Sequence, residues 1–152
     1  GSWGRPDMAP FIFTKKILDC ETININNNGD MWRDFTHVDD IVEGVLRIAD
    51  VLPGRDEHWT VERGTSASSS APYAVYNIGN GSPISLMDFV KAIEDELGIE
   101  AKKNFREMQP GDVYQTYADT QDLFTATGYK PQLGIKEGVA EFVAWYKKFY
   151  NK

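Results

Sequence analysis

The sequence is poor in cysteine and histidine, and it contains no long apolar run. Its one cysteine, Cys20, allows no internal disulfide, which favours a reducing, cytoplasmic compartment. The two histidines, His37 and His58, lie far apart with no cysteine partner, so the spacing of a zinc site is missing and we expect no bound metal. The longest apolar run is far shorter than the roughly 20 residues of a transmembrane helix, and a secretory signal is equally missing, so we expect no membrane partner.

Positive charge is also scarce. The 152 residues include 16 Lys and Arg against 23 Asp and Glu, which gives a formal net charge of −7. This balance argues against non-specific binding to nucleic acid or to an anionic membrane surface. It also means that an anionic ligand must be bound by a few local cations.

The chain has enough apolar material for one domain with a real core. Hydrophobic residues make up 41% of the sequence, which excludes wholesale disorder, and 152 residues is an ordinary length for a single domain. The dipeptide Gly1-Ser2 is typical of a cloning scar, so we assign the domain to residues 3–152.

Periodic apolar residues predict helices that alternate with short extended segments. Thr36 and Ser85 are the predicted N-caps of two helices, and Gly98 is a predicted left-handed stop. The expected helices cover about 6–18, 36–52, 86–97, 119–127 and 135–150, and the expected strands cover 21–26, 73–79 and 100–105. This order indicates a mixed α/β domain with short strands and about four main helices.

One long segment has no periodicity. The stretch "PGRDEHWTVERGTSASSSAP" is polar and rich in serine and glycine, so we expect a flexible loop at 53–72. Its serines offer hydroxyl groups, but a nucleophile on a mobile segment is poorly positioned for catalysis.

Arg33 is the most informative single residue. It lies in "GDMWRDFTHVDDIV", between two aromatic residues and just before a helix, so it is held at the edge of rigid structure. A planar guanidinium can bind a phosphate through two parallel hydrogen bonds. The alternative is structural pairing with Asp34, Asp39 or Asp40, and from the residues alone this alternative is favoured.

Two further patterns are incomplete. "YNIGNGSPISLMDFV" has the strand, glycines and helix of a dinucleotide-binding turn, but Ile84 stands where the third glycine is needed, so we interpret it as a tight turn. No tyrosine is followed by a lysine four residues later, so the Tyr-x-x-x-Lys pair of a short-chain dehydrogenase is missing. We therefore assign no catalytic and no cofactor-binding residue to this chain.

Several other motifs resemble the C-terminal part of the extended short-chain dehydrogenase/reductase superfamily, and most closely the nucleotide-sugar epimerases of the UDP-glucuronate 4-epimerase type. In order along the chain, the matching segments are "WGRPDMAPF", "RDFTHVDDIVEG", "APYAVYNIGNGSPISLMDFVKAIE", "MQPGDVYQTYAD" and "GYKPQLGIKEGVAEFVAWY". The resemblance implies a small mixed α/β substrate-binding lobe. The NAD-binding Rossmann lobe with the catalytic Tyr and Lys would be a separate, N-terminal part of the parent protein.

The resemblance assigns roles to residues near the phosphates of a nucleotide sugar. Arg33 matches the arginine that binds the diphosphate, and Phe35 matches an aromatic position beside the nucleotide. Gln109 stands where the superfamily often has a second diphosphate arginine, a difference that suits the glucuronate type. From its charge and position alone, Arg5 is a candidate to meet the carboxylate of a hexuronate.

The resemblance also assigns the nucleoside side of the site. The strand residues Asn24, Ile25 and Asn26 match the segment whose backbone meets the uracil. Asp112 matches a ribose-side carboxylate, and Asp7 matches a substrate-contacting position that is often Asn in related enzymes. These residues, with those near the phosphates, form the expected UDP-sugar site.

The function implied is therefore UDP binding by one lobe of an NAD-dependent UDP-hexuronate or UDP-hexose 4-epimerase, a homodimer in polysaccharide biosynthesis, with the isolated lobe inactive and free of NAD. Two alternatives remain open. The lobe could belong to a sugar-nucleotide dehydratase or decarboxylase of the same superfamily, or the chain could be a stand-alone nucleotide-binding module without chemistry.

Overall fold

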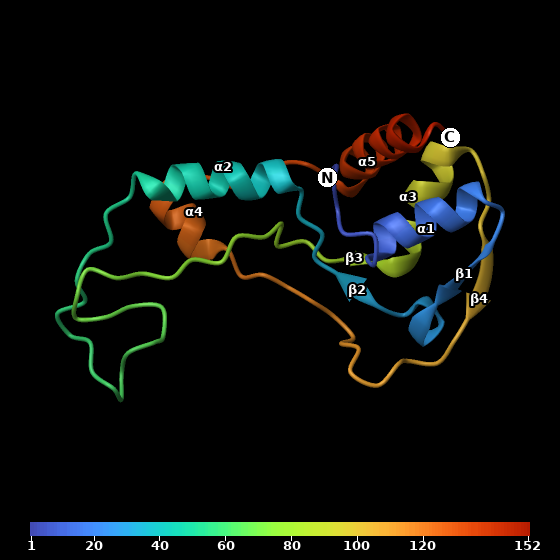
Figure 1. Ribbon diagram of the computed structural model, residues 1–152. Helices are drawn as coiled ribbons and strands as arrows, with labels where there is room; N and C mark the ends of the chain where they lie inside the picture. The colour runs from blue at the N-terminus through green and yellow to red at the C-terminus, as the bar shows by residue number, and fades with distance from the viewer.

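The computed structural model describes all residues 1–152 and has a mixed α/β fold with short strands, as the sequence predicts. The elements are α1 (Ala9–Leu18), β1 (Thr22–Ile25), the 3-10 turn η1 (Asn26–Gly29), β2 (Trp32–Arg33), α2 (Val38–Ala49), β3 (Ile84–Ser85), α3 (Leu86–Leu97), β4 (Lys102–Phe105), α4 (Gln121–Thr127) and α5 (Ile135–Tyr150). Figure 1 shows α1, α3, α5 and the strands gathered at one end, with α2, α4 and the loop after α2 extending from them.

The core lies where α1, α3 and α5 meet β1. Its largest fully buried side chain is Phe89 of α3, which lies against Phe13 of α1 and stacks on Phe35. The same cluster takes in Ile23 and Ile25 of β1 and the inner stripe of α5. Burial of side chains of this size contributes roughly 1.5–3 kcal/mol each, which stabilises this end of the molecule.

The strands form two short two-stranded sheets. β1 pairs in parallel with β4, from Thr22 opposite Lys102 to Ile25 opposite Phe105. β2 pairs antiparallel with β3, so that Arg33 lies opposite Ile84. The second pairing brings the Arg33 segment to the start of α3, and a single bridge from Trp32 to Gln115 adds the chain before α4.

Two of the three predicted helix signals are confirmed. Ser85 is the N-cap of α3, and its hydroxyl accepts a hydrogen bond from the Asp88 N–H. Gly98 ends that helix with a φ of 67°, in the left-handed region that suits glycine. Thr36 was the wrong residue for the N-cap of α2: His37 takes that place, while the Thr36 hydroxyl accepts the Asn80 N–H.

The expected strand at 73–79 does not form. Ala74 makes one antiparallel bridge with Ser68, and no ladder extends it. A composition rich in β-formers yields a strand only where a partner strand lies alongside, and here none does. The side chain of Asn77 instead donates to the carbonyl of Asp119, which holds the segment beside the chain that enters α4.

The loop at 53–72 has no helix or strand, in agreement with its composition. It does contain one local contact. The Trp59 indole Nε1–H donates to the carbonyl of Thr65 at 3.3 Å, and the ring lies against Gly64 so closely that a Cβ there would be 2.0 Å from Nε1. The tip of the loop is therefore folded back on itself.

None of the helices is both long enough and apolar enough to cross a membrane.

Candidate nucleotide-sugar site

A cavity of about 570 Å³ opens between α1, β1, β2 and the start of α5. Of the nine residues expected in the site, six line it: Arg5, Asn24, Asn26, Arg33, Phe35 and Asp112. These residues come from four segments of the chain, and the hydrogen bond between Asn26 and Asp112 joins two of them across 86 positions. The cavity has apolar walls with a few convergent polar groups, as small-molecule sites usually have.

Arg33 is half-buried, and it is not paired with any carboxylate. Its Nη1 donates to the carbonyls of Trp32 at 2.7 Å and Tyr114 at 3.1 Å. No ion pair in the structure includes it. The two carbonyls fix one nitrogen, while Nε and Nη2 keep donors that no protein group accepts. The arrangement orients the guanidinium and leaves it able to bind an anion.

Of the carboxylates considered as partners of Arg33, Asp34 and Asp40 accept hydrogen bonds from other groups, and Asp39 is exposed and makes no ion pair with Arg33. Asp34 has the clearest role. Its Oδ2 accepts the N–H groups of Gly81 and Ala118, both at 3.0 Å, and its Oδ1 accepts that of Ser82 at 3.4 Å. Asp34 thus ties the glycine turn to the chain before α4. Sequence reasoning missed this role because the three N–H groups come from two distant segments.

The same contacts test whether the glycine turn could hold a dinucleotide. A pyrophosphate would need the N–H groups that the Asp34 carboxylate already accepts. A Cβ on Gly79 would lie 2.5 Å from the Cβ of Ala118, so this glycine is needed for close packing against the protein chain. The turn does not fit NAD, in agreement with the interpretation made from its missing third glycine.

The end of the cavity next to β1 carries an amide and carboxylate pair. Asn26 Nδ2 donates to Asp112 Oδ2 at 3.2 Å, and Asn24 Oδ1 accepts from Asn104 Nδ2 at 3.1 Å across the β1–β4 pair. Phe35 stacks on Phe89 with ring centroids 4.6 Å apart, which fixes its ring at the wall. Asp112 keeps one carboxylate oxygen without a protein donor, so it can accept hydrogen bonds from hydroxyl groups.

Three of the expected residues do not line the cavity. Ile25 is fully buried in the core, and its carbonyl accepts the Arg106 N–H at 2.8 Å. Gln109 and Asp7 are exposed. Asp7 Oδ1 lies 3.3 Å from Nε of Arg5, and this pair is at the open rim, with side chains 70% and 73% exposed.

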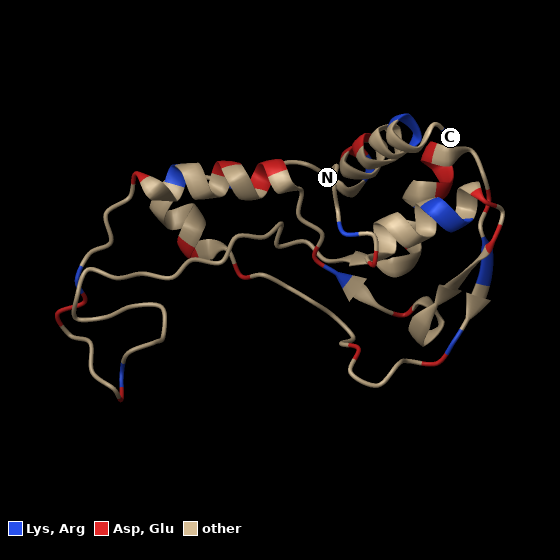
Figure 2. Cartoon of the chain, in the orientation of Figure 1, with Lys and Arg blue, Asp and Glu red and all other residues tan.

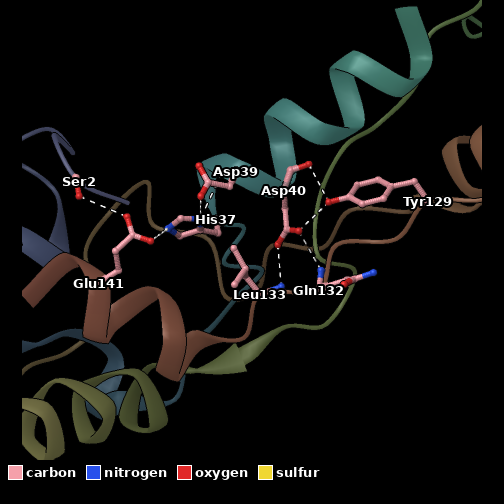
Figure 3. Close-up of polar contacts among 8 residues, drawn as sticks. All are labelled: Ser2, His37, Asp39, Asp40, Tyr129, Gln132, Leu133 and Glu141. Carbon is pink, nitrogen blue, oxygen red and sulfur yellow. Dashed lines mark hydrogen bonds and ion pairs between the residues drawn. The ribbon is translucent and has the colours of Figure 1, made fainter. Parts of the chain in front are cut away.

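His37 forms part of the cavity wall and links two helices, a role that the sequence did not predict. Its imidazole Nδ1 accepts the Asp39 N–H at 3.3 Å, so the neutral ring carries its proton on Nε2, which lies 3.2 Å from Oε2 of Glu141 in α5. Figure 3 shows the ring between α2 and α5, with Ser2 on the far side of Glu141. His37, Asp39 and Glu141 place three possible metal ligands near one another, and the buried Nε2 of His37 lies within ion-pair distance of Glu141 without making a hydrogen bond.

Asp40, the next inward residue of α2, is buried and fully hydrogen-bonded. Its Oδ1 accepts the Tyr129 hydroxyl at 2.7 Å and the Gln132 N–H at 3.0 Å, and its Oδ2 accepts the Leu133 N–H at 2.9 Å (Figure 3). Burial alone would raise the pKa of Asp40, but these three hydrogen bonds outweigh it and lower that pKa. Burial, together with the bond to Asp40, raises the pKa of Tyr129 to about 12. This contact joins α2 to the segment whose Leu133 lines the cavity.

Arg5 and Arg33 are the only Lys or Arg residues that line the cavity. Elsewhere the basic residues are spread along the chain, and acidic residues lie in the first turn of α2 (Figure 2). A dianionic ligand in the cavity would therefore depend on these two guanidinium groups rather than on a basic surface.

Comparison with solved structures identifies the fold. The chain aligns with the UDP-glucuronic acid 4-epimerase from Bacillus cereus, solved with UDP-glucuronic acid and NAD, at a TM-score of 0.79 and 27% identity, over 99% of this chain and 43% of that one. MoeE5, also solved with UDP-glucuronic acid and NAD, gives a TM-score of 0.77 at 30% identity, over 98% and 44% of the two chains. The fold is thus that of one part of an extended short-chain dehydrogenase/reductase, as the resemblance implied.

Residues 11–142 match the family model described as GDP-mannose 4,6 dehydratase, and the chain belongs to this family. It is 56% identical over 151 residues to an uncharacterized 37.6 kDa protein of Escherichia coli O111:H-, over 99% of this chain and 45% of that protein. It is 42% identical to a probable UDP-glucuronate 4-epimerase of Rhizobium meliloti (strain 1021), over 100% of this chain and again 45% of the relative. The chain therefore spans somewhat less than half the length of these relatives.

Proposed function

We propose that this chain is the part of an NAD-dependent UDP-hexuronate or UDP-hexose 4-epimerase that binds the UDP portion of its substrate. The observation that carries the proposal is the state of Arg33, which is oriented by two carbonyls, free of carboxylates and directed to one cavity together with most of the expected site. A glucuronate substrate is favoured because the Rhizobium meliloti relative and the two structural neighbours concern that sugar nucleotide.

In this proposal each part of the cavity binds one part of the ligand. Arg33 binds the diphosphate, Asn24 and Asn26 meet the uracil, and Asp112 accepts hydrogen bonds from the ribose hydroxyls. Phe35 supplies an apolar wall beside the nucleotide. Binding of these non-reacting groups would anchor the nucleotide while the sugar is turned between two orientations, a use of remote binding energy that catalysis commonly exploits.

The chemical step belongs to the remaining part of the parent protein. NAD, when bound there, supplies reversible oxidation of the sugar, and the glycine turn of this chain takes no part because Asp34 occupies it. We expect the isolated chain to be inactive, because it has no Tyr-x-x-x-Lys pair. The parent would work as a homodimer in the cytoplasm, where an exposed, unpaired cysteine such as Cys20 is stable, and would serve polysaccharide synthesis.

Titration of the isolated chain with UDP tests the proposal. We expect weak binding, in the high micromolar to millimolar range or about −4 to −6 kcal/mol, followed by amide shifts in NMR spectra at the cavity residues. Arg33→Ala should weaken binding by about 1.5–3 kcal/mol, the range for a hydrogen bond to a charged group. The matched control is Arg55→Ala, an exposed arginine of the loop, which should have no effect. Equal titrations for wild type and Arg33→Ala would assign Arg33 a structural role only.

A dehydratase is the second candidate, because the matching family model carries that description. Dehydratases of dTDP-glucose share the fold at TM-scores of 0.77 and 0.76, but at 17% and 20% identity they indicate the fold alone. A stand-alone module is the third. Assay of the parent protein with both UDP-glucuronate and UDP-glucose separates all three. A 4-epimer product supports the proposal, a 4-keto-6-deoxy product from UDP-glucose supports a dehydratase, and binding of both without turnover supports a module.

A further inference from the structure

The segment that follows β4 contributes to the nucleotide cavity without any helix or strand of its own. Residues 106–120 run as open chain from β4 to α4 (Figure 1), and they carry Asp112, which lines the cavity. They also carry Tyr114, whose backbone carbonyl accepts a hydrogen bond from Nη1 of Arg33. The cavity therefore depends on how firmly an irregular segment is held in place.

Backbone contacts attach this segment to β2 at one point. The attachment is the single bridge between Trp32 and Gln115, and no ladder continues it on either side. In it, the Trp32 N–H donates to the carbonyl of Tyr114 at 2.9 Å, and the Trp32 carbonyl accepts the Thr116 N–H at 3.2 Å. Asp34 holds the half of the segment beyond this bridge. Two strands paired over so short a length are not stable alone, so the half before the bridge needs further contacts.

One such contact joins the phenol of Tyr114 to the turn before β2. Its hydroxyl donates to Oδ1 of Asp30 at 3.0 Å, across 84 positions of the sequence. This hydrogen bond raises the pKa of Tyr114, with smaller contributions from burial and from the negative charge of Asp30. Neither side chain lines the cavity, so the pair acts on a bound ligand only through other residues.

The turn that carries Asp30 fixes the position of this contact. Asn27 and Asn28 have φ angles of 47° and 52°, in the left-handed region that asparagine adopts more readily than most residues. The Asp30 N–H donates to the carbonyl of Asn27, and the Asn27 amide donates to the Asp30 carbonyl at 2.6 Å. Asn26, at the start of the same turn, donates to Asp112. One turn thus holds the segment at two points.

We propose that Tyr114 and Asp30 are positioning residues for the diphosphate, because they hold in place the carbonyl that orients Arg33. The inference rests on the proposed function, since Arg33 binds a diphosphate only in that function. Without the phenol contact, the Tyr114 carbonyl would move more freely, and Nη1 of Arg33 would keep only the carbonyl of its neighbour Trp32 as a fixed acceptor. The guanidinium would then be correctly oriented for part of the time, and affinity would fall by that fraction.

The test is an NMR titration with UDP of variants that remove the contact in two ways. Tyr114→Phe removes the donor and Asp30→Ala removes the acceptor, and each should weaken UDP binding by about three- to tenfold, the range for one hydrogen bond. Tyr117→Phe is the control for the phenol, because Tyr117 lies in the same segment, is 63% exposed and does not line the cavity. Asp30→Asn is the control for the lost charge, since its amide oxygen can still accept the Tyr114 hydroxyl. Both controls should bind UDP within about twofold of wild type.

A second readout follows Arg33 directly and needs no ligand. In wild type, the Nε–H of Arg33 should give one dispersed NMR signal with a high heteronuclear NOE, as expected of a fixed guanidinium. Tyr114→Phe and Asp30→Ala should lower that NOE, while Asp30→Asn and Tyr117→Phe should leave it unchanged. A contact that only stabilised the fold would leave the signal unchanged in every variant that remains folded.

The two readouts separate failure of this inference from failure of the proposed function. If UDP binds to Tyr114→Phe with wild-type affinity, the positioning role is overturned and the function stands. Weaker UDP binding without a change at Arg33 also overturns it, and so does an equal loss of affinity in Asp30→Asn and Asp30→Ala. If wild type does not bind UDP, the function is wrong, and the Arg33 signal decides alone: a lowered NOE in Tyr114→Phe upholds the positioning of the guanidinium, and an unchanged NOE overturns it.

Discussion

The hydroxyl of Tyr129 donates to Oδ1 of Asp40 at 2.7 Å, in a buried contact between residues 89 positions apart. The same carboxylate accepts two backbone N–H groups, from Gln132 and Leu133. A buried charge is tolerated only when such partners replace its hydration. Through this one side chain, α2 is fixed to the segment that runs from α4 to α5.

Asp40→Asn is expected to destabilise the protein by about 2–3 kcal/mol. The amide keeps the shape of the side chain but loses the charge, and it can accept from fewer of the three donors, so a buried backbone N–H is left weakly satisfied. Urea unfolding followed by circular dichroism measures the change. Asp39→Asn is the control, because the Asp39 side chain is 72% exposed, and it should change the free energy of unfolding by no more than about 0.5 kcal/mol.

The acid dependence of stability should depend on the same residue. Because the pKa of Asp40 is lower in the folded chain than in the unfolded chain, its contribution is fully present above the unfolded pKa and is lost as pH falls through the folded pKa. Between about pH 5 and pH 2, wild type should therefore lose more stability than Asp40→Asn, and the two curves should converge. Parallel curves over that range would show that Asp40 does not titrate with folding.

Local signals in the sequence were sufficient for most elements of the fold. Ser85 with Asp88 and the stop at Gly98 could be identified because a cap is a contact between near neighbours. The prediction of a strand at 73–79 was wrong because a strand depends on a distant partner, which composition does not reveal. His37 rather than Thr36 caps α2 for a similar reason. The Thr36 hydroxyl accepts a hydrogen bond from the N–H of Asn80, 44 residues away, so a distant contact decides its role.

In the candidate site, too, some residues could be identified from the sequence and others only from tertiary contacts. The resemblance could point to Arg33, Asn26 and Asp112, and the structure places all three at one cavity. It could not show that Asp34 would bind the glycine turn, which is what frees Arg33 from its neighbour. Pairings of that kind are set by tertiary contacts between segments, so they become visible only in the folded chain.

The loop at 53–72 should be mobile except near Trp59. Backbone amides of the serine-rich part are expected to give low heteronuclear NOE values, while the indole N–H of Trp59, bonded to Thr65, should give a single, dispersed signal. Gly64→Ala places a methyl group on the indole ring and should displace that signal alone among the four tryptophans. Uniformly high NOE values through the loop would contradict the prediction of mobility.

Arg5 is expected to distinguish a hexuronate from a hexose, and the effect should be small. Its guanidinium lies at the cavity rim, where it is 73% exposed and already 3.3 Å from the carboxylate of Asp7. An ion pair at such a site contributes at most about 1 kcal/mol and weakens as salt is added. Arg5→Ala should therefore reduce affinity for UDP-glucuronate by up to about fivefold at low salt and leave UDP-glucose unchanged, as measured by NMR titration. Asp7→Asn should have the opposite effect on UDP-glucuronate, because it releases Arg5 from its present partner. Equal losses for the two ligands in Arg5→Ala would mean that the residue contacts the shared diphosphate instead.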